Sequence, residues 1–289
     1  ELHEALKHYE CCVLLLQDEL AVEPEPETVR LFERMLAEPP PDHAVSQTAV
    51  SGQAASSVVA RERELARLQS LLHNDLAAVR LAFEVGEAGS GKTALMEAFV
   101  LQNPVVVSVM GRCNAFSGSG DAFLPFRELL QGLLTLHALL PLNPFDLIVQ
   151  HGPQLINTLL PAERLAAWAD ALWATDETMR QTAETRLAAI VAENQNPSLQ
   201  LEGLFAQLTA DFGAVAEQVP LLLIIDDLQW LDQGSVDLLF HLCRALPQHA
   251  FGLLGAYRPE DVAANEPHPI QPLLHELRRQ FGDVVVNLD

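Results

Sequence analysis

Residues 86–93, GEAGSGKT, are the first segment of the chain whose residue types and spacing could bind a reactive group. This octapeptide is a complete G-x-x-x-x-G-K-[ST] pattern, in which glycines let backbone N–H groups point inward around an anion. Lys92 adds a mobile catalytic cation for the β- and γ-phosphates, and the Thr93 hydroxyl is a hard oxygen suited to Mg²⁺. The predicted phosphate-binding residues are Gly86, Glu87, Ala88, Gly89, Ser90, Gly91, Lys92 and Thr93. The pattern predicts a site for ATP or ADP with Mg²⁺, and the alternative is an ordinary glycine-rich turn.

A second group of candidate residues follows the apolar run 221–225, LLLII, which ends in Asp226-Asp227. A nucleotide site of this kind needs carboxylates at the end of a neighbouring buried strand, for Mg²⁺ and for the attacking water. We expect Asp226 to bind Mg²⁺ and Asp227 to orient or deprotonate the hydrolytic water. The alternative is that the pair only caps a helix, which Asp does well.

A cation follows another apolar run, at Arg258-Pro259-Glu260 after residues 251–257. The carboxyl ends of parallel strands meet at one edge of a sheet, so the guanidinium is expected near the same site. There Arg258 could sense or stabilise the γ-phosphate as a catalytic residue. The alternative for Arg258 is a surface salt bridge.

The elements that must position these groups alternate between strands and helices. The apolar runs of strand length are 81–85, 105–110, 221–225, 251–257 and 284–288. Helical patterns cover 93–101 and recur around 126–134 and 236–243. This alternation predicts an α/β fold with a five-stranded parallel sheet flanked by helices, and ligands bind at the carboxyl ends of such strands.

Four motifs in this order carry a family resemblance. They are RERELARL (61–68), GEAGSGKT, LLLIIDDLQWLD (221–232) and GAYRPED (255–261). Together they resemble the STAND subclass of AAA+-related P-loop NTPases, especially the origin-recognition-like AAA ATPase module of bacterial transcriptional regulators. The similarity covers about residues 58–289. It implies that Arg61 and Glu62 lie near the base or ribose, although Ala60 stands where the family usually has Gly. The family's GRC segment also appears at 111–113, after the second predicted strand, and its role is open.

The amino-terminal segment, residues 1–38, forms two helical patterns separated by Pro24 and Pro26. It resembles the last repeat of the TPR-like bacterial transcriptional activator domain. The matching positions are Ala5, Tyr9, Glu19, Leu20, Pro24, Glu27, Thr28 and Leu31. Stacked repeats need neighbours to bury their faces, so we expect a piece of a longer protein; the alternative is a single helical hairpin docked on the ATPase.

The rest of the predicted organisation is a linker and one large domain. Residues 39–57 have no Lys, Arg, Phe, Trp or Tyr, so they cannot build a core and are predicted to be a linker. Residues 58–289 form the ATPase domain, with a helical insertion at about 141–197. Leu165, Trp168, Ala169 and Leu172 give this insertion one apolar face. We interpret it as a lid or signalling element for the ATP site, and the alternative is plain core packing.

Composition excludes several classes of function. The chain has 289 residues and a formal net charge of −22, which would repel nucleic acid, so no direct nucleic-acid contact is expected. No apolar run approaches the 18 or more residues that span a bilayer. Its 4 Cys and 10 His show no metal-ligand spacing. These features predict a cytoplasmic protein with reduced thiols.

Two functional classes remain after these exclusions. In the first, ATP binding and slow Mg²⁺-dependent hydrolysis switch a multidomain transcriptional regulator between an inactive monomer and an active assembly. Its partners would be ATP, a second copy of the chain, and flanking DNA-binding and sensor domains. In the second, the domain is a nucleotide-stabilised scaffold that does not turn over. A metabolic kinase is disfavoured because no acceptor site is recognisable.

Overall fold

The computed structural model describes residues 61–73, 80–114, 122–136, 140, 142–194, 201–246, 250–264 and 267–288. The chain divides into two compact units, Glu1–Ala54 and Ala55–Asp289, and every described residue belongs to the second unit. The helix pair predicted at 1–38 and the linker predicted at 39–57 therefore lie outside the described residues.

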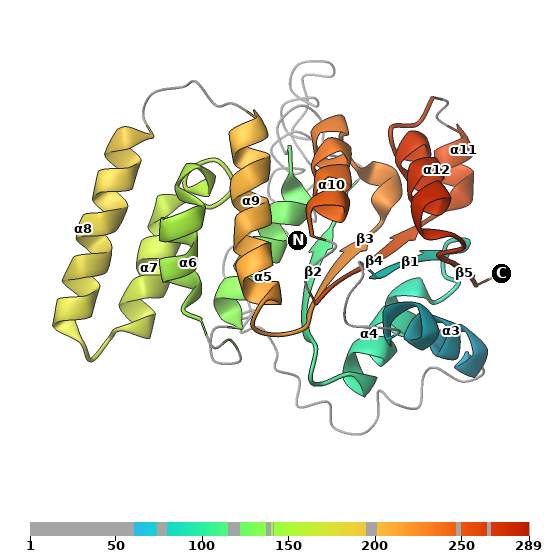
Figure 1. The fold of residues 1–289 in the computed structure, drawn as a ribbon, viewed down its shortest axis with the longest axis horizontal. Coiled ribbons are helices and arrows are strands. Elements are labelled where there is room, and N and C mark those ends of the chain that lie inside the picture. The colour runs from blue at the N-terminus through green and yellow to red at the C-terminus, as the bar shows by residue number, and fades with distance from the viewer. Residues whose placement is uncertain are drawn as a thin grey trace, which may run out of the picture. The chain divides into compact units, whose positions relative to one another are not determined.

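Five parallel strands form one sheet in the order β2-β3-β4-β1-β5 (Figure 1). Their bounds are Arg80–Val85 (β1), Val107–Arg112 (β2), Leu221–Asp226 (β3), Phe251–Tyr257 (β4) and Val285–Asn287 (β5). The prediction of a five-stranded parallel sheet is confirmed. β3 and β4 are buried along their whole length, as expected for central strands covered on both faces.

Two details of the sheet differ from the prediction. β2 begins at Val107 rather than at residue 105, because the Val106 N–H turns back to the Asn103 carbonyl and pairing with the next strand starts only at Val107. The strand that ends in Asp226 is also not the neighbour of β1, because β4 lies between them. Strand order depends on how the helical crossovers pack, which local sequence patterns do not encode.

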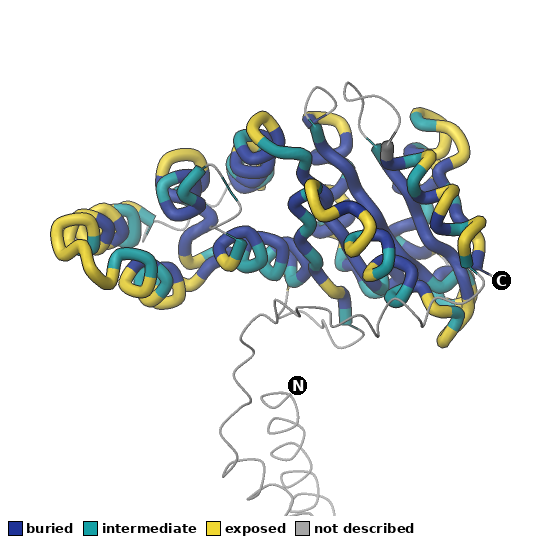
Figure 2. Tube along the Cα trace, turned by 90° about the horizontal axis from the view of Figure 1, so that it is seen from below, coloured by how far each residue is buried: buried dark blue, intermediate teal, exposed yellow. Residues whose placement is uncertain are grey.

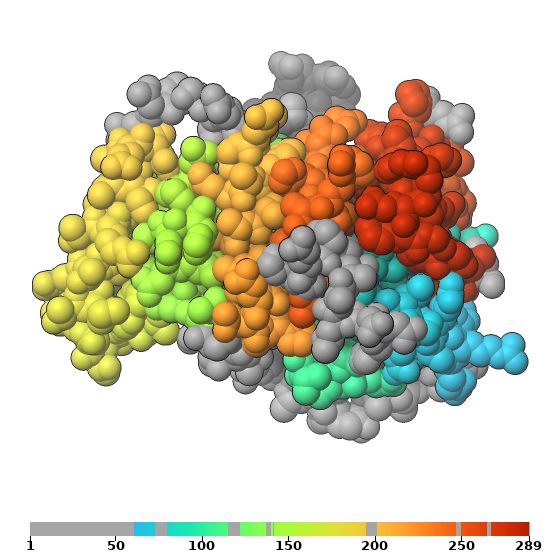
Figure 3. All heavy atoms as spheres, viewed as in Figure 1, coloured from blue at the N-terminus to red at the C-terminus, as the bar shows by residue number. Residues whose placement is uncertain are grey.

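Helices cover both faces of the sheet (Figure 1). On one face, α3 (Glu62–His73) and α4 (Lys92–Gln102) pack over apolar residues that include Ala82, Ile224 and Leu254. The helices on the other face are α5 (Leu124–Thr135), α9 (Leu201–Ala216), α10 (Gln233–Ala245) and α12 (Ile270–Phe281). Figure 3 shows α9, α10 and α12 side by side on one surface of the molecule.

Four elements lie between α5 and α9. They are α6 (Pro144–His151), the 3₁₀ turn η4 (Pro153–Leu155), α7 (Ala162–Leu172) and α8 (Glu177–Glu193). Of the apolar face expected in α7, Leu165 and Ala169 are buried, whereas Trp168 and Leu172 are half-buried. Trp168 stacks on Phe145 of α6 and donates its indole N–H to the Leu134 carbonyl of α5 at 2.9 Å. Figure 2 shows the outer sides of these helices exposed and the strands buried.

α5 packs closely against the end of β2. A Cβ atom added to Gly111 would lie 2.3 Å from the carbonyl oxygen of Pro125, so only glycine fits there. Gly111 and Arg112 are the last two residues of β2. The predicted strand, 105–110, had ended before them, so their placement after the strand was wrong. The Arg112 N–H donates to Glu128 of α5 at 2.7 Å, which ties the strand end to the helix.

Candidate functional site

The loop between β1 and α4 has the backbone geometry that its glycines predict. Gly89 and Gly91 adopt left-handed conformations, with φ of 80° and 91°. Glycine reaches this region without steric cost. α4 begins directly after Gly91, with no side-chain cap and no acidic residue in its first turn. The first N–H groups of the helix have no intrahelical acceptors, so they and the positive helix end suit a phosphate.

Lys92 lies against the inner side of this loop. Only 7% of the residue is exposed, and its Nζ donates to the carbonyl oxygens of Gly86 and Glu87 at 2.7 and 2.8 Å. These weak carbonyl partners carry no full negative charge. A triphosphate would therefore compete well for the ammonium group.

Arg61 reaches the same loop from the residue before α3. Its Nη2 donates to the Ser90 carbonyl at 3.1 Å, and its Nη1 forms a 3.0 Å ion pair with Glu64. Arg61 thus lies beside the loop. Glu62 is the first residue of α3 and is exposed.

Thr93 joins the loop to the end of β3. Its Oγ1 donates to Oδ2 of Asp226 at 2.9 Å, across the intervening strand β4. Asp226 is 6% exposed. In the described part of the chain no group of three or more His, Cys, Asp and Glu could hold a metal ion. A hydroxyl beside one carboxylate instead fits Mg²⁺, which takes one or two protein oxygens and keeps several waters.

Asp227 follows in a left-handed conformation, with φ of 57°. Its N–H donates to Oδ1 of Asp226 at 2.9 Å, and its own Oδ1 lies 3.5 Å from Nη2 of Arg258. Arg258 also approaches Asp261 of α11 (Pro259–Ala264) at 3.9 Å. The predicted water-binding carboxylate and the predicted γ-phosphate sensor are therefore direct partners. The pair is half-buried, with 35% and 33% of the two side chains exposed.

A buried carboxyl group in β1 escaped the sequence analysis. Glu84 is 0% exposed, and neither of its carboxyl oxygens has a hydrogen-bond partner among the described residues. Burial raises the pKa of Glu84 to about 9; the Asp226 carboxylate adds to the rise and the Lys92 ammonium opposes it. The group is therefore neutral at pH 7. A single acidic residue within the apolar run 81–85 was the signal that could have found it.

Two further residues of the site were also missed. Gln229 and His268 are buried, at 2% and 5% exposure. The Gln229 side chain forms hydrogen bonds with Asp227 and Arg258, and the His268 ring forms one with the Gln229 carbonyl. Gln229 lies inside the DDLQWLD block, but nothing local shows which groups its amide contacts. His268 lies 39 residues further along the chain, so only the fold brings it to the site.

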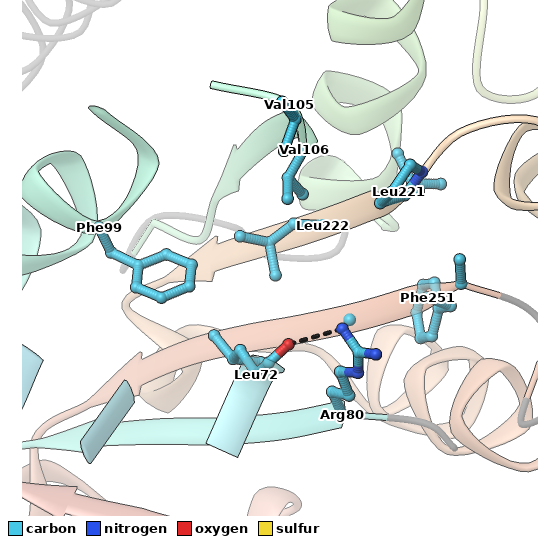
Figure 4. A pocket seen from close by; sticks show the side chains of 11 residues that line it. Leu72, Arg80, Phe99, Val105, Val106, Leu221, Leu222 and Phe251 are labelled. Atoms are coloured by element: carbon cyan, nitrogen blue, oxygen red, sulfur yellow. Dashed lines mark hydrogen bonds between the residues drawn. The ribbon is translucent and has the colours of Figure 1, made fainter. Parts of the chain in front are cut away.

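The hollow drawn in Figure 4 lies at the amino-terminal ends of the strands, opposite the carboxyl ends that carry the candidate site. Its volume is about 440 Å³, and it is lined by the first residues of several strands, including Leu221 and Phe251. Its walls are mostly apolar, apart from Arg80, whose guanidinium donates to the Leu72 carbonyl at 2.8 Å. None of the predicted site residues lines it. The candidate chemistry thus belongs to the carboxyl edge of the sheet.

A family model for the AAA ATPase domain matches residues 57–254, more than half of the chain. The chain belongs to this family. Membership in the AAA ATPase domain family indicates nucleotide binding and ATPase chemistry. The match ends within β4, before Arg258. No curated protein matches the chain.

The AAA ATPase part of the predicted resemblance is thus confirmed. The STAND subclass, the regulator context and the TPR-like repeat remain predictions. Among the helices that the structure describes, none is both long and apolar enough to cross a bilayer.

Proposed function

We propose that this AAA ATPase domain binds ATP and hydrolyses it slowly, as the switch module of a multidomain transcriptional regulator. The observation that supports this most is the 2.9 Å hydrogen bond between Thr93 Oγ1 and Asp226 Oδ2. It joins the phosphate-binding loop to the end of β3 although the two strands are not neighbours. Two oxygens of the kind that Mg²⁺ prefers therefore lie beside the loop.

Each residue of the site has a role in this proposal. Residues 86–93 and Lys92 hold the phosphates. Thr93 and Asp226 would bind Mg²⁺, which neutralises charge on the β- and γ-phosphates when bound. Asp227 positions the attacking water and accepts its proton.

Arg61 and Glu62 are the proposed contacts to the base or ribose. The contact between Arg61 and the Ser90 carbonyl supports this for Arg61, because it fixes the guanidinium beside the loop. Glu62 is assigned from the family resemblance only.

The pair of Asp227 and Arg258 supplies the switch. Arg258 lies 3.5 Å from Asp227, and a γ-phosphate would compete for the guanidinium because it carries more negative charge. Movement of Arg258 toward the phosphate would free the Asp227 carboxylate for water. ADP has no γ-phosphate and leaves the pair intact, so the two nucleotides stabilise different arrangements.

One observation favours the alternative of a nucleotide-stabilised scaffold. Oδ1 of Asp227 already interacts with Arg258 and with the side-chain amide of Gln229. If neither partner moves, this oxygen cannot accept a proton from water. A domain that keeps this arrangement, and in which no water reaches the other oxygen, would bind nucleotide tightly without turnover.

The regulator context rests on the sequence resemblance. We propose that residues 1–38 end a TPR-like domain, that 39–57 form a linker, and that the ATPase domain spans 58–289 with a helical insertion at about 141–197. The assembly would be cytoplasmic, would self-associate in a nucleotide-dependent way, and would carry DNA-binding and sensor domains beyond this segment.

Equilibrium binding tests the site, with ATP titrated in Mg²⁺ and again in EDTA. We expect Lys92→Ala to abolish binding. Thr93→Val should keep the affinity measured in EDTA but lose the gain from Mg²⁺, by at least about tenfold. Thr135→Val, which removes an exposed hydroxyl from α5, is the matched control. Binding of ATP by Lys92→Ala at the wild-type affinity would refute the site.

A further inference from the structure

The segment after β3 is built around one buried amide. Asp227 is followed by the 3₁₀ turn η5 (Leu228–Trp230), which places Gln229 in the interior at 2% exposure. Nε2 of Gln229 donates to Oδ1 of Asp227 at 2.8 Å. Oε1 of Gln229 accepts from the backbone N–H of Arg258 at 3.1 Å. One side chain therefore binds both residues of the proposed switch, Asp227 at its carboxylate and Arg258 at its backbone.

His268 fixes the backbone of the same turn. The Ile270 N–H donates to Nδ1 of His268 at 3.2 Å, so Nε2 must carry the ring proton. Nε2 lies 2.9 Å from the Gln229 carbonyl oxygen and donates to it. Ile270 is the first residue of α12. The turn is thereby attached to the start of a helix that packs on the sheet.

We propose that Gln229 is a positioning residue of this site. Its side chain holds the Asp227 carboxylate and the Arg258 backbone in a fixed position relative to each other. His268 in turn attaches the backbone of Gln229 to α12. The inference rests on the proposed function, because it assigns no chemistry of its own to Gln229. It extends the set of functional residues beyond those that bind phosphate, metal or water.

The contacts give this role a physical basis. A buried amide with both ends satisfied has one orientation, because rotation would place donor against donor and acceptor against acceptor. The Asp227 carboxylate is therefore fixed at one oxygen. When Arg258 moves toward a γ-phosphate, its backbone N–H stays bonded to Gln229, so only the side chain swings. The hydrogen bond to Oδ1 of Asp227 also persists and leaves the second carboxylate oxygen for the water.

Two substitutions separate the two contacts. Gln229→Leu removes both. Gln229→Glu has nearly the same shape and keeps the acceptor for the Arg258 N–H, but in its ionised form it replaces the donor to Asp227 by a second carboxylate that repels it. Gln233→Leu is the matched control, because Gln233 makes a similar 2.8 Å bond to Asp237 on the exposed side of α10. Single-turnover rates and the dissociation constants for ATP and ADP are measured for each protein.

We expect both Gln229 variants to convert bound ATP about 10- to 100-fold more slowly, because a displaced catalytic group costs this much. The ADP dissociation constant should stay within about threefold, since the hydrogen bonds of Gln229 go to Asp227, Arg258 and His268 and not to the loop 86–93. Gln229→Leu should also narrow the difference between ATP and ADP affinity, while Gln229→Glu should keep it. The control should behave like the wild type.

Three results would overturn the inference. One is a rate for Gln229→Leu within about twofold of the wild type, which leaves the proposed function intact. Another is an ADP affinity that falls as much as the rate, which would show a merely structural role. If the wild-type protein converts no ATP, the proposed hydrolytic function is wrong. In that case the ratio of ATP affinity to ADP affinity tests the positioning role: a ratio in Gln229→Leu equal to that of the wild type refutes it, and a ratio closer to one supports it.

Discussion

Replacement of Glu84 by Gln should stabilise the domain in a strongly pH-dependent way. Glu84 is fully buried in β1 without a hydrogen-bond partner among the described residues, and its pKa is raised from 4.5 to about 9. The folded chain therefore keeps a proton on this carboxyl group between these two pH values, whereas the unfolded chain has lost it. Proton release on unfolding makes the free energy of unfolding fall as the pH rises.

The size of the effect follows from the shift. Each pH unit within this window lowers the free energy of unfolding by about 1.4 kcal/mol, so the cost at pH 7 is about 3 kcal/mol. The amide introduced by Glu84→Gln does not titrate and has nearly the shape of the protonated acid. We expect the variant to match the wild type near pH 5 and to exceed its stability by about 3 kcal/mol at pH 7, or about 6–12 °C in Tm.

Urea unfolding from pH 5 to pH 8.5, in EDTA and without nucleotide, measures this difference. Glu97→Gln is the control, because it removes an exposed carboxylate from α4 on the same side of the sheet. A stability difference between Glu84→Gln and the wild type that does not change with pH would refute the reasoning. It would mean that Glu84 is charged in the folded protein and finds a partner such as Lys92.

Two further substitutions test the packing around the site. His268→Ala leaves the Gln229 carbonyl and the Ile270 N–H without their imidazole partners. We expect the free energy of unfolding, measured with urea, to fall by about 1–3 kcal/mol, and a fall of less than about 0.5 kcal/mol would contradict this. Gly111→Ala would place a Cβ atom 2.3 Å from the Pro125 carbonyl oxygen and should cost about 1–3 kcal/mol. Gly132→Ala, whose Cβ atom would lie 3.2 Å from a Val109 methyl and 4.0 Å from the Val109 Cα, should cost less, and the opposite order would show that α5 does not pack on β2 as described.

Local patterns predicted the elements that carry the phosphate chemistry. The loop 86–93 and the block that ends in Asp226-Asp227 each contain a strand end and the groups that follow it, so short-range sequence determines both. β2 was misplaced by two residues because a strand begins where its partner begins, and that partner comes from a distant segment.

The residues that were missed depend on the tertiary fold. Glu84 interrupts an apolar run by one residue, and its neutral state follows only from complete burial. Gln229 meets the Arg258 backbone 29 residues away and His268 39 residues away. Strand order, with β4 between β1 and β3, makes these contacts possible, and nothing in the individual segments specifies that order.

The central claim is that this site hydrolyses ATP with Asp227 as the group that positions water. Its most direct test is the single-turnover conversion of bound ATP to ADP in Mg²⁺, with the wild type and Asp227→Asn compared at equal occupancy. We predict slow conversion by the wild type, and retained ATP affinity without conversion by the variant. Conversion by Asp227→Asn at the wild-type rate, or tight binding without any conversion by the wild type, would contradict it.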